Sequence, residues 1–136
     1  MPIVGFNFTE IGSKKQSKFL PNKKVKSDLK LTGLEKEKLP IGESDDVLKF
    51  LFNFKIEYED CGEINLLGHV LYLDDLKKID EILKKWEGKK NMPVDLMDTI
   101  LNAILFRCHI KALMLSQDVN LPPHFKMPRV VPKVEN

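Results

Sequence analysis

Apolar and polar residues alternate along residues 47–58, and this is the most regular pattern in the chain. Leucine, phenylalanine, isoleucine or tyrosine occupies every second position from 48 to 58, with lysine, asparagine or glutamate at most positions between them. Successive side chains of a strand point to opposite faces, so the pattern predicts a strand with one face on a core. Glu59-Asp60-Cys61-Gly62 follows and predicts a hairpin connection.

Looser alternation predicts three more strands, over residues 3–11, 25–31 and 63–73. Residues 33–46 contain two glycines, a proline and a polar run, and this composition predicts a loop. We expect the four strands to form one antiparallel sheet.

The strand predicted over residues 63–73 is apolar on both faces. Leu67, Leu71 and Leu73 alternate with a second apolar set that includes Ile64 and Val70. A strand of this kind is typical of a sheet that is covered on both sides. We expect the cover on the second side to be a partner subunit or a bound polypeptide.

Apolar residues at helical spacing predict two helices after the strands. The first begins after Asp74, a plausible N-cap, and ends near residue 86; the second runs from Val94 to about Gln117. The second helix carries two apolar stripes, whereas packing within one domain requires one. We expect the first stripe to belong to the core; it consists of Met97, Leu101, Ile104, Cys108 and Leu115. We expect the second stripe to meet a partner, a second copy or a bound chain; it consists of Leu96, Ala103, Ile110 and Met114, extended by Phe106 and Leu113.

A proline-punctuated apolar tail, Leu121-Pro122-Pro123-His124-Phe125-Lys126-Met127-Pro128, follows the long helix. The whole pattern predicts an α+β fold, in which a four-stranded antiparallel sheet is packed by a connecting helix and one long helix. We expect residues 1–136 to form a single domain.

The composition favours a globular protein of the cytoplasm. The 136 residues are 43% hydrophobic and 31% charged, with a net charge of +2. Cys61 and Cys108 form no CxxC pair, which fits a reducing compartment. The first residues lack the pattern of a secretory signal, and no uninterrupted apolar run reaches membrane-spanning length. We expect no stable membrane insertion.

Candidate catalytic and metal-binding residues are better explained by structural roles. Cys108 and His109 are adjacent on a predicted helix, about 100° apart, so they do not easily share one ion. The pairs Asp45-Asp46 and Asp74-Asp75 lie where loops meet predicted elements, as turn and cap residues do. The sequence contains no glycine-rich phosphate loop and no nucleophile elbow. We therefore expect no enzyme activity, no cofactor and no metal.

A run of lysines in the first quarter of the chain leaves nucleic-acid binding open as an alternative. The run surrounds Phe19, and basic residues with an aromatic can follow phosphates. Acidic residues balance the charge, and Arg107 and Arg129 are the sole arginines. We favour a solvated lysine surface and expect no nucleic-acid partner; the lysines are Lys14, Lys15, Lys18, Lys23, Lys24, Lys26 and Lys30.

The order of these segments resembles the SecB family of protein-export chaperones over nearly the whole chain. In this resemblance Phe6-Asn7-Phe8 and Val25 to Leu31 correspond to the two short strands, and Val47 to Tyr58 corresponds to the long strand. Gly68 to Leu73 corresponds to the strand before the connecting helix. Pro93 through Leu115 corresponds to the long helix, and residues 121–128 correspond to the crossover loop. It implies homotetramers built as dimers of dimers, with the long helices at the junction between dimers. It also implies binding of unfolded polypeptide in surface grooves without nucleotide, and delivery to the export motor SecA.

Two features differ from the family pattern, and both concern docking to the motor. The family is typically acidic, whereas this chain has a net charge of +2. The sequence also ends soon after the crossover, where the family has a short C-terminal helix. A chaperone that acts outside a SecA pathway is therefore one form of the hypothesis.

We predict an ATP-independent chaperone that holds unfolded polypeptides, with export precursors as one class of client, and that assembles as a homo-oligomer. The alternatives are a nucleic-acid-binding module and a structural subunit of a larger complex. A lone subunit is expected to leave some large apolar side chains exposed, and we expect these to contact the polypeptide. They are Leu67, Leu71, Phe106, Met114, Leu121, Phe125 and Met127.

Overall fold

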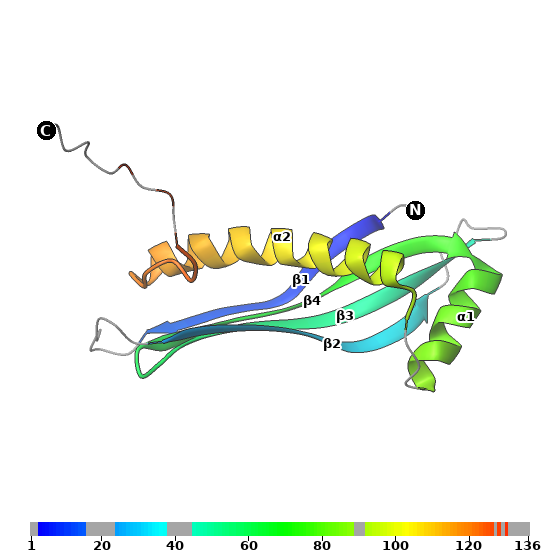
Figure 1. The fold of residues 1–136 in the computed structure, drawn as a ribbon, viewed down its shortest axis with the longest axis horizontal. Helices are drawn as coiled ribbons and strands as arrows, with labels where there is room; N and C mark the ends of the chain where they lie inside the picture. The colour runs from blue at the N-terminus through cyan, green and yellow to red at the C-terminus, as the bar shows by residue number, and fades with distance from the viewer. Residues whose placement is uncertain are drawn as a thin grey trace, which may run out of the picture.

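Four long strands and two helices make up the chain in a computed structural model that describes residues 3–15, 24–37, 45–88, 92–126, 128 and 130. In order they are β1 (Ile3–Lys15), β2 (Val25–Glu37), β3 (Asp45–Tyr58), β4 (Gly62–Asp75), α1 (Leu76–Glu87) and α2 (Val94–Asp118). The strands form one antiparallel sheet in the order β1-β4-β3-β2. Figure 1 shows α2 along one face of this sheet and α1 at one end. The predicted α+β fold is confirmed.

The core lies between α2 and the face of the sheet formed by the alternating apolar residues of β3. The six residues at even positions from Leu48 to Tyr58 are at most 3% exposed. Ile100 and Ile104 of α2 and Ile79 of α1 are fully buried in the same cluster. We call this side the core face of the sheet. The opposite, far face carries the intervening residues of β3, of which Lys49 and Lys55 are examples.

Two predicted boundaries are wrong, and a β-bulge in β2 accounts for the first of them. The pairing of β2 with β3 shifts between Leu31 and Gly33, and the shift places Leu34 opposite Phe50 on the core face. A bulge inserts one residue, so the period-two pattern changes phase and no longer resembles a strand. Residues 33–37 therefore continue β2 within the segment predicted as a loop. The second wrong boundary is the start of β3, because residues 45–46 of that segment already pair with Asp75 and Asp74 at the end of β4.

The predicted N-cap of the first helix is also wrong. The helix begins at Leu76, and the preceding residue, Asp75, makes no side-chain cap hydrogen bond. Asp74 instead accepts a hydrogen bond from the Tyr72 hydroxyl at 2.6 Å and one from the Asp75 backbone N–H at 2.8 Å. The Asp74 carboxylate therefore fixes the end of β4 rather than the first turn of α1.

Candidate functional site

The buried stripe of α2 follows a spacing of four residues, so it differs from the predicted core stripe. Leu96 belongs to the buried stripe, whereas Met97, Leu101 and Leu115 are half-buried. Side chains four residues apart form a ridge along a helix, and helices commonly pack through such ridges at an oblique angle to the neighbouring element. The buried apolar residues are Leu96, Ile100, Ile104, Cys108 and Ala112.

An exposed row of large apolar residues lies on the outer side of α2. Phe106, Ile110 and Met114 are spaced four apart and are 68%, 46% and 54% exposed. We call these three residues the outer ridge. Their exposure confirms that part of the second predicted stripe is not needed for the core of one subunit. Contiguous exposed apolar surface of this kind is typical of an interaction site.

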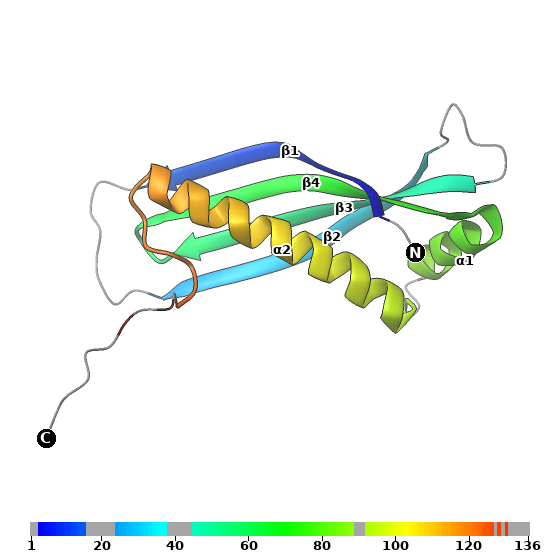
Figure 2. The ribbon, with the colours of Figure 1, turned by 90° about the horizontal axis from the view of Figure 1, so that it is seen from above.

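Two contacts identify what lies on each flank of α2. The Arg107 guanidinium is 5.3 Å from the centroid of the Phe6 ring, so this flank faces β1. The His109 ring is 5.5 Å from the Phe54 ring of β3, so the other flank faces the β3 side. Figure 2 shows α2 crossing the sheet obliquely.

The flank that carries His109 also carries half-buried apolar residues. Leu101 and Leu105 precede His109 by eight and four residues, so they share its side of the helix. On the core face of β2, a further set of leucines is half-buried in the same way. We call these residues together the flank band; they are Leu101, Leu105, Leu29, Leu31 and Leu34.

The tail is folded back against α2 and β3 as far as Phe125. Asn120 has a φ of 58°, and this left-handed turn lets the Leu121 N–H donate to the Ser116 carbonyl at 2.7 Å. The Tyr58 hydroxyl donates to the Pro122 carbonyl at 2.6 Å. Leu121 is consequently 5% exposed, so the expectation that it is free on the surface of a lone subunit is wrong.

His109 and His124 are joined by a short hydrogen bond between Nδ1 and Nε2, at 2.6 Å. The ring planes are 9° apart and the centroids 4.9 Å apart. That centroid distance matches two rings side by side in nearly one plane, with the bond in line between them, rather than one ring above the other. The Phe125 ring meets both imidazoles at close to a right angle.

Burial keeps both imidazoles neutral near pH 7. Loss of solvation, followed by the proximity of His109, lowers the pKa of His124 from 6.5 to about 4. Loss of solvation also lowers the pKa of His109. The His109 side chain is half-buried. No pattern in the sequence indicates this pair, because the rings are 15 residues apart.

We expect the free energy of unfolding to decrease as the pH falls from 6.5 towards about 4. Over this interval the unfolded chain takes up protons at positions where the folded chain does not, so stability is complete above pH 6.5 and is lost on acidification. The full shift of His124 corresponds to about 3.4 kcal/mol at about 1.4 kcal/mol per pKa unit, and solvent screening of the half-buried ring reduces the expected loss to about 1–2 kcal/mol. Urea unfolding of the wild type and of His124→Phe at several pH values measures this. An unchanged pH slope in the variant contradicts the prediction.

The residues expected to contact polypeptide lie on both sides of the sheet. Leu67 and Leu71 are half-buried on the far face, whereas the outer ridge and Phe125 lie on the core-face side. Phe125 is 44% exposed, and Met127 lies outside the described residues. One subunit therefore does not bring the seven residues into a single surface. Their contact with polypeptide stays a prediction, as does a cover for the far face.

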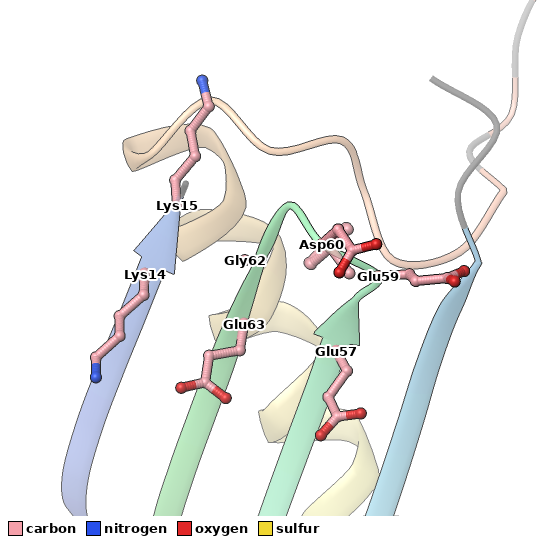
Figure 3. Close-up of a pocket in the computed structure, with 8 residues that line it drawn as sticks. Lys14, Lys15, Glu57, Glu59, Asp60, Gly62 and Glu63 are labelled. Carbon is pink, nitrogen blue, oxygen red and sulfur yellow. The ribbon is translucent and has the colours of Figure 1, made fainter. Parts of the chain in front are cut away.

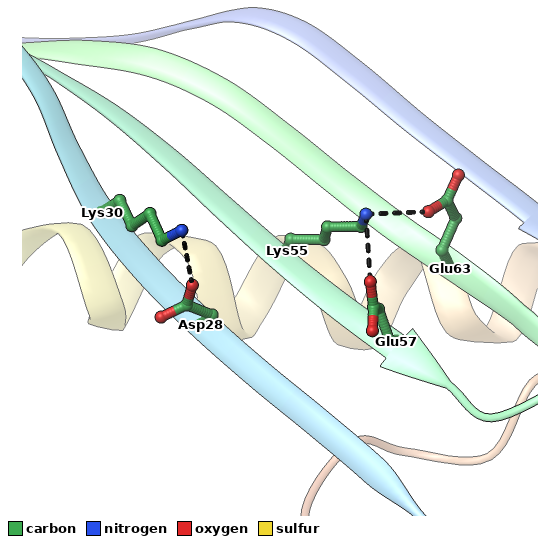
Figure 4. A network of polar contacts seen from close by, with 5 residues as sticks. All are labelled: Asp28, Lys30, Lys55, Glu57 and Glu63. Carbon is green, nitrogen blue, oxygen red and sulfur yellow. Dashed lines mark ion pairs between the residues drawn. The ribbon is translucent and has the colours of Figure 1, made fainter.

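Carboxylates are interspersed among the lysines at the hairpin end of the sheet. Figure 3 shows Lys14 and Lys15 at the end of β1, close to Glu63 on β4 and to acidic residues of the hairpin. On the far face, the Lys55 ammonium is 3.1 Å from Glu57 and 3.5 Å from Glu63 (Figure 4). A phosphate backbone meets mixed charge here rather than a positive track.

No described group of three or more histidine, cysteine or acidic residues is placed to hold a metal ion. By length and composition α2 is apolar enough to cross a membrane, and 28% of its apolar window is buried. Ile100, Ile104, Cys108 and Ala112 are fully buried in the core. One side of α2 therefore packs on the sheet, and its outer side stays exposed. The features that remain for function are the outer ridge, the flank band and the tail.

Comparison with solved structures identifies a protein of similar fold. It is the SecB-like chaperone Rv1957 of Mycobacterium tuberculosis, in complex with a ChAD peptide from the Rv1956 HigA1 antitoxin. The TM-score is 0.50 with 12% sequence identity, over 98% of this chain and 92% of that chain. No family model and no curated protein sequence matches the chain. The chain therefore has a SecB-like fold.

Proposed function

We propose that this protein is an ATP-independent chaperone of the cytoplasm that holds unfolded polypeptide. The observation that carries the proposal is the outer ridge, where three large apolar side chains are 46–68% exposed on a SecB-like subunit. The structural neighbour supports it, because that protein is a chaperone bound to a peptide.

The surface for polypeptide would comprise the outer ridge, the flank band and Phe125. Burial of apolar area contributes about 25 cal/mol per Å², reduced by the cost of ordering the bound chain. Met114 is flexible and polarizable, so it suits clients of varied sequence. No covalent step is required, and neither nucleotide nor metal takes part.

We also propose that the subunits assemble as a homo-oligomer, with a dimer of dimers as the expected form. An apolar ridge on one subunit needs a partner when no client is bound, since exposed apolar rows promote association. Where the clients are precursors, the proposal extends to their handover to an export motor. Light scattering measures the subunit number directly.

Replacing the tail contacts tests the proposal. We expect Phe125→Asp combined with Met127→Asp to reduce suppression of client aggregation severalfold, because two charges replace apolar contacts. The assay mixes the protein with chemically unfolded model proteins, without ATP, and follows light scattering. Lys126→Asp, between the two positions, controls for added negative charge. Full suppression by the double variant contradicts the role of the tail.

The two alternatives give different results in simple assays. Binding to single-stranded RNA through the lysines would weaken steeply with salt, whereas apolar holding of polypeptide changes little. A structural subunit would bind one fixed partner and would not suppress the aggregation of unrelated unfolded proteins. The interspersed carboxylates favour the chaperone over the RNA-binding module.

A further inference from the structure

The tail beyond Pro122 is held by few contacts. Among the described residues, its hydrogen bond to the rest of the chain is the one between His109 and His124. Ring contacts of His124 and Phe125 with Phe54 and His109 add to it. Leu121, by contrast, is buried in the core, so the chain up to Pro122 is firmly anchored. The junction between the anchored and the lightly held parts is the rigid Pro122-Pro123 pair.

The hydrogen bond between the imidazoles requires one shared proton. Nδ1 of His109 faces Nε2 of His124, so one nitrogen must donate and the other accept. A proton on each facing nitrogen would set two N–H groups against each other. Phe54 and Phe125, which pack against the pair, carry no charge; Lys126 is exposed, and the Cys108 thiol is buried with its pKa raised to about 12.

Docking of His124 also has a cost. Its Nδ1 atom is buried and has no hydrogen-bond partner. With its proton on Nε2, His124 donates to His109 and leaves a bare nitrogen buried; with the proton on Nδ1, it would leave a buried N–H unpaired. The cost of an unsatisfied buried group is similar in size to the gain from one hydrogen bond and a few ring contacts. The docked arrangement is therefore only weakly favoured.

We propose that residues 123–126 form a removable cover, docked on α2 by the His109–His124 hydrogen bond, whose release exposes further apolar surface to polypeptide. Phe54 lies beneath the cover and is 1% exposed when it is docked. Release uncovers this ring beside the flank band and frees Phe125 on a short tether. This inference rests on the proposed function, since it concerns regulation of the same surface.

Trypsin cleavage after Lys126 reports release of the cover without any client. The protease binds an extended stretch on both sides of the bond, including His124 and Phe125, so cleavage follows the population of the open form. At about pH 8 we expect His124→Ala or His109→Ala to speed cleavage about five- to tenfold, the effect of one hydrogen bond. The double variant should be no faster than either single variant.

Two controls separate the shared bond from general loosening. His109→Asn places an amide near the position of Nδ1, so it should restore slow cleavage, and His69→Ala on the far face should leave the rate unchanged. In the wild type, ring ¹⁵N NMR should show a coupling between Nδ1 and Nε2 across the bond. Absence of the coupling, or single-variant effects that multiply in the double variant, overturns the proposal. This NMR measurement stands even where a variant does not fold.

The client assay then tests the regulation separately. With the cover open in His124→Ala, suppression of aggregation should increase at equal protein concentration. If cleavage accelerates but suppression does not increase, the cover does not regulate the surface and the proposal fails. If wild type and variant both show no suppression, the chaperone function itself is wrong, while the cleavage and NMR results still report on the docking.

Discussion

Gly68→Ala is expected to lower the free energy of unfolding by about 3 kcal/mol, the upper range for overpacking a core. Gly68 lies in the middle of β4, opposite Phe8 on one side and Phe52 on the other. A Cβ there would lie 2.3 Å from the Asn7 carbonyl oxygen and 2.8 Å from the Phe52 ring. The first neighbour is backbone, so relief requires β1 to move away from β4.

Gly12→Ala is the matched control for this substitution. Gly12 lies in β1, and a Cβ there meets no heavy atom within 4 Å. Its replacement should be neutral or slightly stabilising, because alanine loses less backbone freedom on folding. Urea unfolding of both variants measures the difference at constant m-value. If the two variants differ by less than about 0.5 kcal/mol, the close packing of β1 and β4 at Gly68 is wrong.

The sequence predicted this sheet wherever the period of two was uninterrupted. The alternation from residue 48 to 58 placed every large side chain of β3 on its correct face. The extension of β2 beyond Leu31 was missed, because the bulge before Gly33 reverses the phase of the pattern. A bulge has no reliable sign in a single sequence, since its extra residue can be of any polar type; here it is Thr32.

The candidate site was predictable as an excess of apolar residues but not as a shape. Two stripes on one helix predicted an exposed row, and Phe106, Ile110 and Met114 form it. The crossing angle of α2, which moved Leu96 into the core, depends on packing between elements distant in sequence. The same is true of the docked tail. A hydrogen bond between His109 and His124 needs the left-handed turn at Asn120. Asparagine after a helix favours such a turn, but it does not predict where the following residues pack.

The far-face leucines Leu67 and Leu71 also show what an apolar pattern alone does not predict. The Leu71 side chain lies close over Gly5, as its Cδ1 atom would be 3.0 Å from a Cβ placed at Gly5. This close approach half-buries the leucine without any covering helix. An apolar position in a strand therefore does not by itself predict a second covering layer. Leu67 and Leu71 are for this reason weaker candidates for polypeptide contact than the outer ridge.

Charge placed on the outer ridge should give the largest functional effect. We expect Phe106→Asp combined with Met114→Asp to reduce aggregation suppression by more than about tenfold, because each aspartate replaces a large apolar contact with a group that resists desolvation. Folding should be preserved, since both side chains are more than half exposed. Val94→Asp is the matched control, on the same helix at 71% exposure but away from the ridge.

Light scattering on the same variants separates the two uses of the ridge. If the double variant becomes a single subunit and still holds client, the ridge joins copies of the chain and the flank band holds polypeptide. If it keeps the wild-type mass but loses client, the ridge itself contacts polypeptide. Loss of both indicates that the assembled form is required for holding. An unchanged mass together with unchanged suppression would contradict the proposed function, because its central surface would then have no role.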